Sequence, residues 1–222
     1  MLTKDSLQFL EDLRKNNNRD WFQSQKKRYE TYKENYHALV SDFIKVMSTY
    51  DESLESLNVK DCTFRINRDI RFSKDKSPYK THMGIWLSTG QKNTNLAGYY
   101  IHIEKEKSFI AGGKWQPENA DLKKIRKEIE FFHDELGEIL SGQEFRNEFG
   151  GFDREDSLKT APKGYEKDHV AIDHLKLKSF IAAKCIDDKF VLDKDFVQNA
   201  SAKLALLKPL NNFLNRALTT EE

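Results

Sequence analysis

The chain has 222 residues, and its 37 lysines and arginines nearly balance 36 aspartates and glutamates, for a formal net charge of +1. This balance argues against a protein whose whole surface binds nucleic acid or an anionic membrane, since such proteins carry a clear excess of basic residues. A content of 38% hydrophobic and 12% aromatic residues argues against disorder, and the length suffices for a folded domain with a sizeable core.

The sequence shows no sign of a membrane or an export pathway. No stretch approaches the roughly 20 apolar residues of a membrane-spanning helix, so we expect no membrane partner. The N-terminus turns polar at once and lacks the basic-then-apolar pattern of a signal peptide. Cys62 and Cys185 lie beside apolar residues and indicate reduced core cysteines. These features predict a cytoplasmic location.

The N-terminal region has the residue spacing of helices, which we predict within residues 4–48. Thr3 is suited to cap the first helix, and Asn18 is suited to cap the second. The second helix is long, because apolar residues recur three, four or seven positions apart from Phe22 to Met47.

Residues 63–114 change to the alternating pattern of β-strands, and we predict the first strand over residues 64–72. Further short apolar runs with alternating residues follow it. Short polar connectors between these runs favour an antiparallel meander.

Helices return over residues 117–148, and a further strand is predicted over 177–186. The C-terminal stretch 194–218 has a helical stripe, in which Pro209 should kink the helix or begin a new one. No linker or repeat divides the sequence, so we predict a single domain over residues 1–222. The predicted fold class is α+β, an antiparallel sheet of about five strands packed with several helices, with long helices at both ends of the chain.

The segment from Phe64 to His82 carries positive charge that its own carboxylates do not cancel. Arginine binds carboxylate or phosphate at two points, and lysine adds a point charge, so the pattern favours an anion site. A solvated strand with internal ion pairs fits the same pattern, and the sequence leaves both interpretations open. Asp69 and Asp75 face six cationic residues, which are Arg65, Arg68, Arg71, Lys74, Lys76 and Lys80.

Arg68 conflicts with a regular strand over residues 64–72. Side chains of a strand alternate between its faces, which places Arg68 on the same face as Phe64 and Phe72. An unpaired guanidinium on an apolar face is costly. We therefore expect either a bulge at Asn67 and Arg68 or a buried partner for the guanidinium.

His102 and Asp69 are the two candidates for a catalytic residue. His102 shares a predicted strand face with Tyr100 and Glu104, and histidine titrates near neutral pH. A structural hydrogen-bonding role for His102 is the alternative. Asp69 is flanked by Arg68 and by a second arginine, which should lower its pKa and favour an ion-pairing role over proton donation.

The sequence predicts no metal site and no cofactor. His169, Asp173 and His174 lie close together, as do His133 and Asp134, but no His-Glu-x-x-His pattern or cysteine pair accompanies them. No Gly-x-Ser-x-Gly nucleophile motif occurs either. The sequence leaves open whether the chain is an enzyme and which oligomeric state it adopts.

The favoured function is binding of a small molecule that carries phosphate or carboxylate. Nucleic-acid binding ranks second, because aromatic residues interleave with the basic ones as in stacking grooves. A protein-interaction or scaffold role is the third alternative. The candidate anion ligands are Arg65, Asn67, Arg68, Arg71, Lys74, Lys80 and Lys178, and the candidate pocket walls are Tyr79, Tyr100 and Trp115.

Several motifs together resemble the family called domain of unknown function 2461, and the resemblance spans nearly the whole chain. It implies a bacterial-type soluble domain and supplies no catalytic residues. The motifs are Asn17-x-Arg19-x-Trp21-Phe22, the run from Arg65 to Lys80, Gly98-Tyr99-Tyr100-x-His102-Ile103, Gly112-Gly113-x-Trp115-x-Pro117 and Pro162-x-Gly164-Tyr165.

Overall fold

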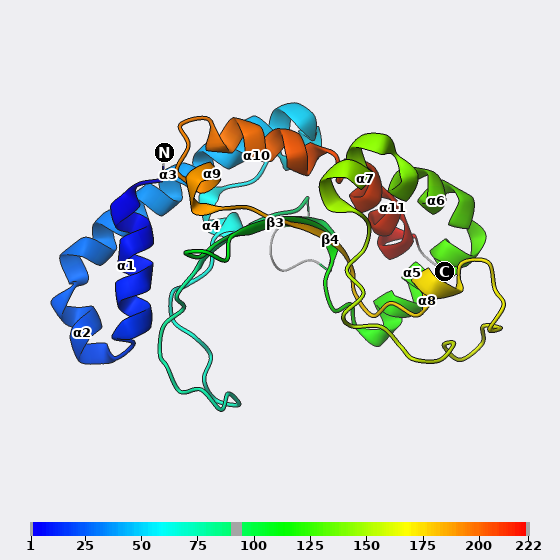
Figure 1. Ribbon diagram of the computed structural model, residues 1–222, viewed down its shortest axis with the longest axis horizontal. Helices are drawn as coiled ribbons and strands as arrows, with labels where there is room; N and C mark the ends of the chain where they lie inside the picture. The colour runs from blue at the N-terminus through cyan, green and yellow to red at the C-terminus, as the bar shows by residue number, and fades with distance from the viewer. Residues whose placement is uncertain (1, 90–94, 221–222) are drawn as a thin grey trace. The chain divides into compact units, whose positions relative to one another are not determined.

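The computed structural model describes residues 2–89 and 95–220 and has an α+β fold (Figure 1). Within these residues, four strands form one antiparallel sheet in the order β1-β2-β3-β4. The α+β class is therefore confirmed, with four strands where about five were expected. The strands are β1 (Met83–Leu87), β2 (Gly98–Ile103), β3 (Phe109–Lys114) and β4 (Phe180–Cys185).

Helices precede the sheet in the region where the sequence predicts them. The Thr3 hydroxyl accepts the Ser6 N–H at 3.1 Å, and the Asn18 side chain accepts the Trp21 N–H at 2.9 Å, so both predicted caps are present. These elements are α1 (Lys4–Lys15), α2 (Arg19–Ser24), α3 (Lys26–Tyr50), the 3-10 turn η1 (Glu52–Leu54) and α4 (Val59–Cys62).

The remaining helices follow the third strand. Pro209 lies in the first turn of the last helix, so the predicted C-terminal helix is split in two at the proline. None of the described helices is long and apolar enough to cross a lipid bilayer. The helices are α5 (Asn119–Phe131), α6 (His133–Ser141), α7 (Gln143–Phe149), α8 (Ile172–Leu175), α9 (Asp188–Val191), α10 (Phe196–Ala205) and α11 (Lys208–Thr219).

The chain forms two compact units. The first comprises residues 1–87, 100–110 and 185–201, and the second comprises residues 88–99, 111–184 and 202–222. Strands β2, β3 and β4 contribute residues to both units.

The core of the first unit is formed by the apolar stripe of α3 and the inward residues of the sheet. Leu39, Phe43 and Ile101 are fully buried, and the Phe43 ring meets Phe196 of α10 edge-on at 5.4 Å. Cys62 is also buried here, as predicted, whereas Cys185 is exposed, and the prediction of a core position for it is wrong.

The second unit packs its helices around buried residues such as Ile125 and Leu210. The Arg126 guanidinium donates hydrogen bonds to the carbonyls of Leu175 and Leu177, which ties α5 to the α8 region. Gly113 of β3 has a φ of 121°, and a Cβ there would lie 2.0 Å from the Phe180 carbonyl oxygen, so this close approach of β3 to β4 requires glycine.

Candidate functional site

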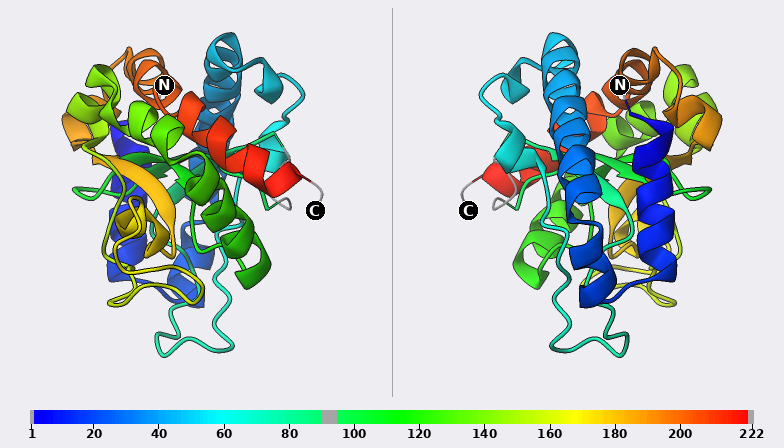
Figure 2. Two further views of the ribbon diagram at one scale, coloured as in Figure 1. Left: turned by 90° about the vertical axis from the view of Figure 1, so that its right-hand side faces the viewer. Right: turned by 90° about the vertical axis from the view of Figure 1, so that its left-hand side faces the viewer.

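Residues 65–80, which we call the cationic arm, connect α4 to β1 within the first unit and extend beyond α1 and α2 (Figures 1 and 2). The arm doubles back on itself. The Arg68 N–H donates to the Pro78 carbonyl at 2.9 Å, the Lys80 N–H donates to the Ile66 carbonyl at 2.7 Å, and Asn67 pairs with Tyr79 in an isolated antiparallel bridge.

The strand predicted over residues 64–72 is therefore wrong, since its backbone pairing is confined to isolated bridges. Two physical reasons account for this. Pro78 has no N–H to extend the pairing, and the Asp75 side chain accepts the backbone N–H of Ser77 at 2.9 Å, a local bond that competes with a ladder.

Tyr79 anchors the arm to α2 and to the residues before it. The Asn17 side chain donates to the Tyr79 carbonyl at 2.9 Å and accepts the Tyr79 N–H at 3.1 Å, as a neighbouring strand would. The Tyr79 ring is buried and stacks on Phe22 with ring centroids 4.0 Å apart. The candidate pocket wall Tyr79 thus lies in a packed contact.

Both carboxylates of the cationic arm pair with arginines of the same arm. Asp69 receives two hydrogen bonds from the Arg71 guanidinium, which lower its pKa as the sequence predicts. Asp75 pairs with Arg68, and the Ser77 hydroxyl and N–H together with Arg68 lower the pKa of Asp75 to about 2. The partner of Arg68 is therefore an exposed carboxylate rather than the buried group that a regular strand would require.

The other polar groups of the arm face solvent. Arg65, Asn67 and Lys74 are exposed, and neither Arg65 nor Lys74 has an ion pair within the described residues. The Lys76 ammonium donates to the neutral carbonyl of Ile70 at 3.0 Å, and the Lys80 ammonium lies 5.1 Å from the centre of the Phe64 ring. Arg65 and Lys74 therefore add positive charge that no ion pair within the described residues neutralises.

The tip of the arm presents an aromatic ring to solvent. Phe72 is 96% exposed, and the Arg71 guanidinium lies 5.8 Å from the centre of its ring. An aromatic side chain this exposed contributes nothing to a core, which makes it available for stacking with a partner.

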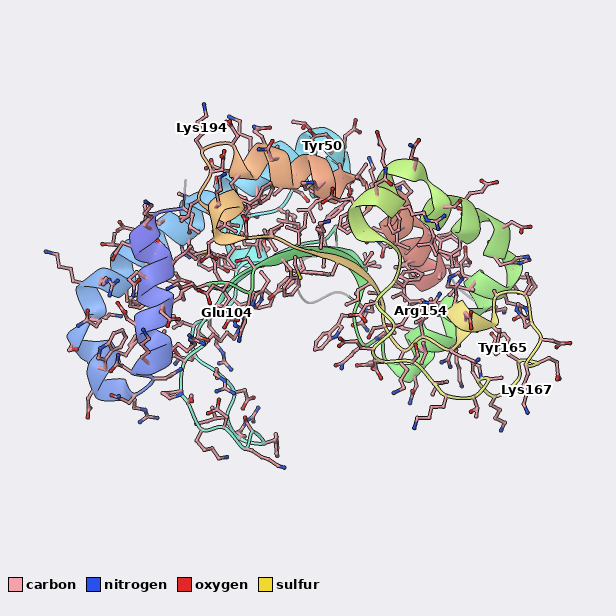
Figure 3. All side chains as sticks on the ribbon, viewed as in Figure 1. Tyr50, Glu104, Arg154, Tyr165, Lys167 and Lys194 are labelled. Atoms are coloured by element: carbon pink, nitrogen blue, oxygen red, sulfur yellow. The ribbon has the colours of Figure 1, made fainter. Side chains whose placement is uncertain are left out.

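A second group of functional side chains lies where the arm meets the sheet. His82 lies between the arm and β1, while His102 and Glu104 lie on and just after β2. We call these three residues the histidine–carboxylate cluster (Glu104 is labelled in Figure 3). One ligand atom from each of the three lies within 4.8 Å of the others. Antiparallel pairing produces this arrangement, because the start of β1 lies beside the end of β2.

The predicted alternation of side chains along β2 explains the surroundings of His102. Ile101 and Ile103 are fully buried, whereas Tyr100, His102 and Glu104 share the other face and are partly exposed. The Tyr100 hydroxyl lies 3.3 Å from His102 Nδ1, and Glu104 Oε2 lies 3.2 Å from His102 Nε2. Both ring nitrogens of His102 therefore have a polar neighbour.

Two aromatic rings stack against that of His102. Its ring lies 4.5 Å from that of His82 and 4.7 Å from that of Phe109, nearly parallel to the latter. Burial lowers the pKa of His102 and raises that of Tyr100 to about 12. At neutral pH we therefore expect an uncharged imidazole beside a protonated phenol.

His82 is affected by both the burial of the cluster and the charges of the arm. Burial is the largest cause that lowers its pKa to about 4, and His102, Lys80 and Arg68 lower it further against the opposing effect of Glu104. Of the arm residues, Lys80 and Arg68 therefore contribute to the lowered pKa of His82, less than burial does.

The structure gathers some of the sequence-predicted site residues and separates others. His102 belongs to the histidine–carboxylate cluster, and the Tyr100 hydroxyl contacts it. Lys80 and Arg68 contribute to the lowered pKa of His82, whereas Asp69 is exposed and pairs with Arg71. Trp115 and Lys178 belong to the second unit, where Trp115 is 67% exposed and Lys178 forms a 2.6 Å ion pair with Asp156.

Sequence reasoning did not single out His82 as a candidate site residue. His82 stands 20 positions before His102, at the end of a charged segment, and nothing in the local spacing links the two residues. The signal that links them is the pairing of β1 with β2, which requires the length of the intervening loop and the register of the strands.

Comparison with known proteins places the chain in a family. No curated protein and no solved structure shows a significant match. The model of the conserved hypothetical protein family DUF2461 matches residues 5–213, a span that includes the cationic arm and the histidine–carboxylate cluster. The match confirms the resemblance seen in the motifs, and the chain belongs to the DUF2461 family of conserved hypothetical proteins.

Proposed function

We propose that the protein binds a small molecule carrying phosphate or carboxylate. The site would lie where Arg68 and Lys80 of the cationic arm approach His82. Arg68 and Lys80 each lie one position from the paired residues Asn67 and Tyr79. They therefore share the face of the arm opposite Tyr79. An anion on this face would meet both cations.

The observation that carries the proposal is the uncancelled charge of the arm. Its six cationic residues and two carboxylates give a formal net charge of +4, and both carboxylates are already paired inside the arm. The effect of Lys80 and Arg68 on His82 supports an anion position near the cluster. Partial burial there strengthens each electrostatic contact relative to one in open water.

Calorimetric titration with pyrophosphate and with citrate at low salt tests this function. We expect saturable binding of at least one of these anions, and a loss of affinity of about tenfold in Lys80→Gln, which removes one charge-assisted contact. The matched control is Lys33→Gln on α3, an exposed lysine outside the arm. Absence of binding, or an equal loss in both variants, would contradict the proposal.

A second candidate function, binding of single-stranded nucleic acid along the arm, is favoured by Phe72. Its exposed ring beside Arg71 offers a stacking surface, and the cations on either side would contact phosphates. Such binding weakens steeply with salt, because each phosphate contact releases counterions.

Titration of a labelled oligonucleotide at low and high salt separates this function from the first. We expect Phe72→Ser to weaken binding about fivefold or more, the lower end of the stacking contribution of one base. Phe131→Ser is the matched control, since Phe131 is 66% exposed on α5, outside the arm. Absence of binding at low salt eliminates the second candidate.

A further inference from the structure

We propose that the histidine–carboxylate cluster, His82, His102 and Glu104, binds a divalent transition-metal ion such as Zn²⁺. The inference depends on the geometry of these three side chains and not on the proposed binding of an anion. Among the described residues, this is the group in which three metal-ligating side chains come together.

The chemical composition of the cluster suits such an ion. Two imidazole nitrogens and one carboxylate oxygen form a known protein ligand set for zinc and for non-haem iron, in which further positions remain open to water or substrate. Imidazole binds a metal in its neutral form, through one of its two ring nitrogens. A cluster made only of carboxylates would suit Ca²⁺ or Mg²⁺ instead.

The spacing of the ligand atoms is close to what the metal requires. Zinc bonds of about 2.0–2.2 Å in a tetrahedral arrangement place neighbouring ligand atoms about 3.3–3.5 Å apart. The 3.2 Å between His102 Nε2 and Glu104 Oε2 is near this value, and all three ligand atoms lie within 4.8 Å. The described residues provide no hydrogen bond to the ring nitrogens of His82, so a small rotation of its side chain costs no such bond.

A second layer of contacts already orients His102. A metal-bound histidine usually engages its other ring nitrogen with a polar group, which fixes the orientation of the ring. Here Nδ1 lies 3.3 Å from the Tyr100 hydroxyl, which leaves Nε2 directed at Glu104. The stacked Phe109 ring restricts the imidazole further, and the side chains of His102 and Glu104 are only 13% and 19% exposed.

The charges around the cluster determine what occupies the open position of the metal. Lys80 and Arg68 of the cationic arm stand two and fourteen residues before His82 in the chain. The metal and its carboxylate together carry a net positive charge, and these neighbouring cations add to it. We therefore expect water or hydroxide, rather than a further cationic group, in the open position.

Within the described residues, the other histidines form no comparable site. His133 Nε2 lies 3.3 Å from Asp134 Oδ1, and its ring is 6.5 Å from that of His169, with no third ligand close enough within the described residues. His133 therefore provides a matched control, a histidine paired with a carboxylate outside the cluster.

Titration of metal-free protein with Co²⁺ in a phosphate-free buffer, followed by visible absorption, tests the inference. We expect one equivalent of Co²⁺ to produce the absorption of a site with nitrogen and oxygen ligands, and Zn²⁺ to displace it. Glu104→Gln and His82→Gln should each weaken binding at least about tenfold, and Tyr100→Phe by a smaller factor, because it removes only a positioning contact. His133→Gln should leave binding unchanged.

Circular dichroism of each variant shows whether it remains folded, and the nearly isosteric Glu104→Gln keeps the test valid if a histidine variant unfolds. Absence of stoichiometric Co²⁺ binding would overturn the inference. Loss of binding in His133→Gln but not in folded Glu104→Gln would also overturn it. Because the probe is the metal alone, a failure of pyrophosphate or citrate to bind the protein would leave this result unaffected.

Discussion

The cationic arm and the histidine–carboxylate cluster are adjacent in the first unit, yet they are built in different ways. In the arm, charged partners lie close in sequence, with Arg71 two residues from Asp69 and Arg68 seven residues from Asp75. In the cluster, His82 and His102 are brought together by strand pairing.

The two regions also differ in how strongly their surroundings act on them. The Asp69–Arg71 ion pair is exposed, and solvent screens the attraction between its charges. The pair therefore adds little to stability. The cluster is partly buried, and burial lowers the pKa of His82 to about 4, which favours a neutral imidazole. The exposed cationic arm thus contributes charge, whereas packing holds the side chains of the half-buried cluster in defined positions.

The largest expected effect comes from removing the packing that anchors the arm beside the cluster. Phe22→Ala deletes a buried ring that stacks on Tyr79, and we expect the free energy of unfolding to fall by about 3 kcal/mol. Urea denaturation measures this change. The control Phe131→Ala removes an exposed ring and should change the free energy of unfolding by less than about 0.5 kcal/mol. Similar losses in the two variants would contradict the anchoring role.

A smaller effect is expected from Tyr36 of α3, which bonds to residues on both sides of the arm in the sequence. The buried Tyr36 hydroxyl donates to the Gly84 carbonyl and accepts the Phe64 N–H, so Tyr36→Phe leaves these groups unpaired. We expect a loss of about 1–2 kcal/mol in the free energy of unfolding, measured by urea denaturation. Tyr29→Phe, on the same helix, should have almost no effect, since no hydrogen bond of its hydroxyl occurs within the described residues. A neutral Tyr36→Phe would show that this contact does not support the arm.

A local effect is expected from the hydrogen bonds that hold Tyr79. Asn17→Ala removes one donor and one acceptor from the Tyr79 backbone, at a cost of about 1 kcal/mol. Amide hydrogen exchange of Tyr79 should become about fivefold faster, which corresponds to that free energy. The exposed Asn199→Ala on α10 is the control, and unchanged exchange at Tyr79 in Asn17→Ala would argue against the anchor.

The smallest effect on stability is expected in the exposed part of the arm. Asp69→Asn breaks a solvent-exposed pair with Arg71 and should leave the urea midpoint unchanged within error. The same substitution raises the net charge of the arm and should strengthen binding of pyrophosphate at low salt, with the gain lost at high salt. Calorimetry at the two salt concentrations measures this gain. A marked fall in the urea midpoint would contradict this expectation, because it would show that the exposed ion pair stabilises the fold.

Particular residues show how far the sequence could be interpreted. Thr3 and Asn18 were predicted as caps because a cap bonds to a backbone N–H only three residues away. The sequence predicts that Tyr100, His102 and Glu104 share one face, because the side chains of a strand alternate between its faces with a fixed period. The strand over residues 64–72 was predicted wrongly, because its apolar alternation is real but its backbone pairing is confined to isolated bridges.

By itself the sequence determined the α+β class and the excess of positive charge over residues 65–80, since these follow from local periodicity and composition, and its motifs determined the family. Only the tertiary structure decided that His82 lies against His102 and Glu104, and that Asn17 and Phe22 hold Tyr79. The physical reason is that these contacts depend on strand register and on the packing of a helix against a distant segment. Neither of these is encoded in the spacing of neighbouring residues.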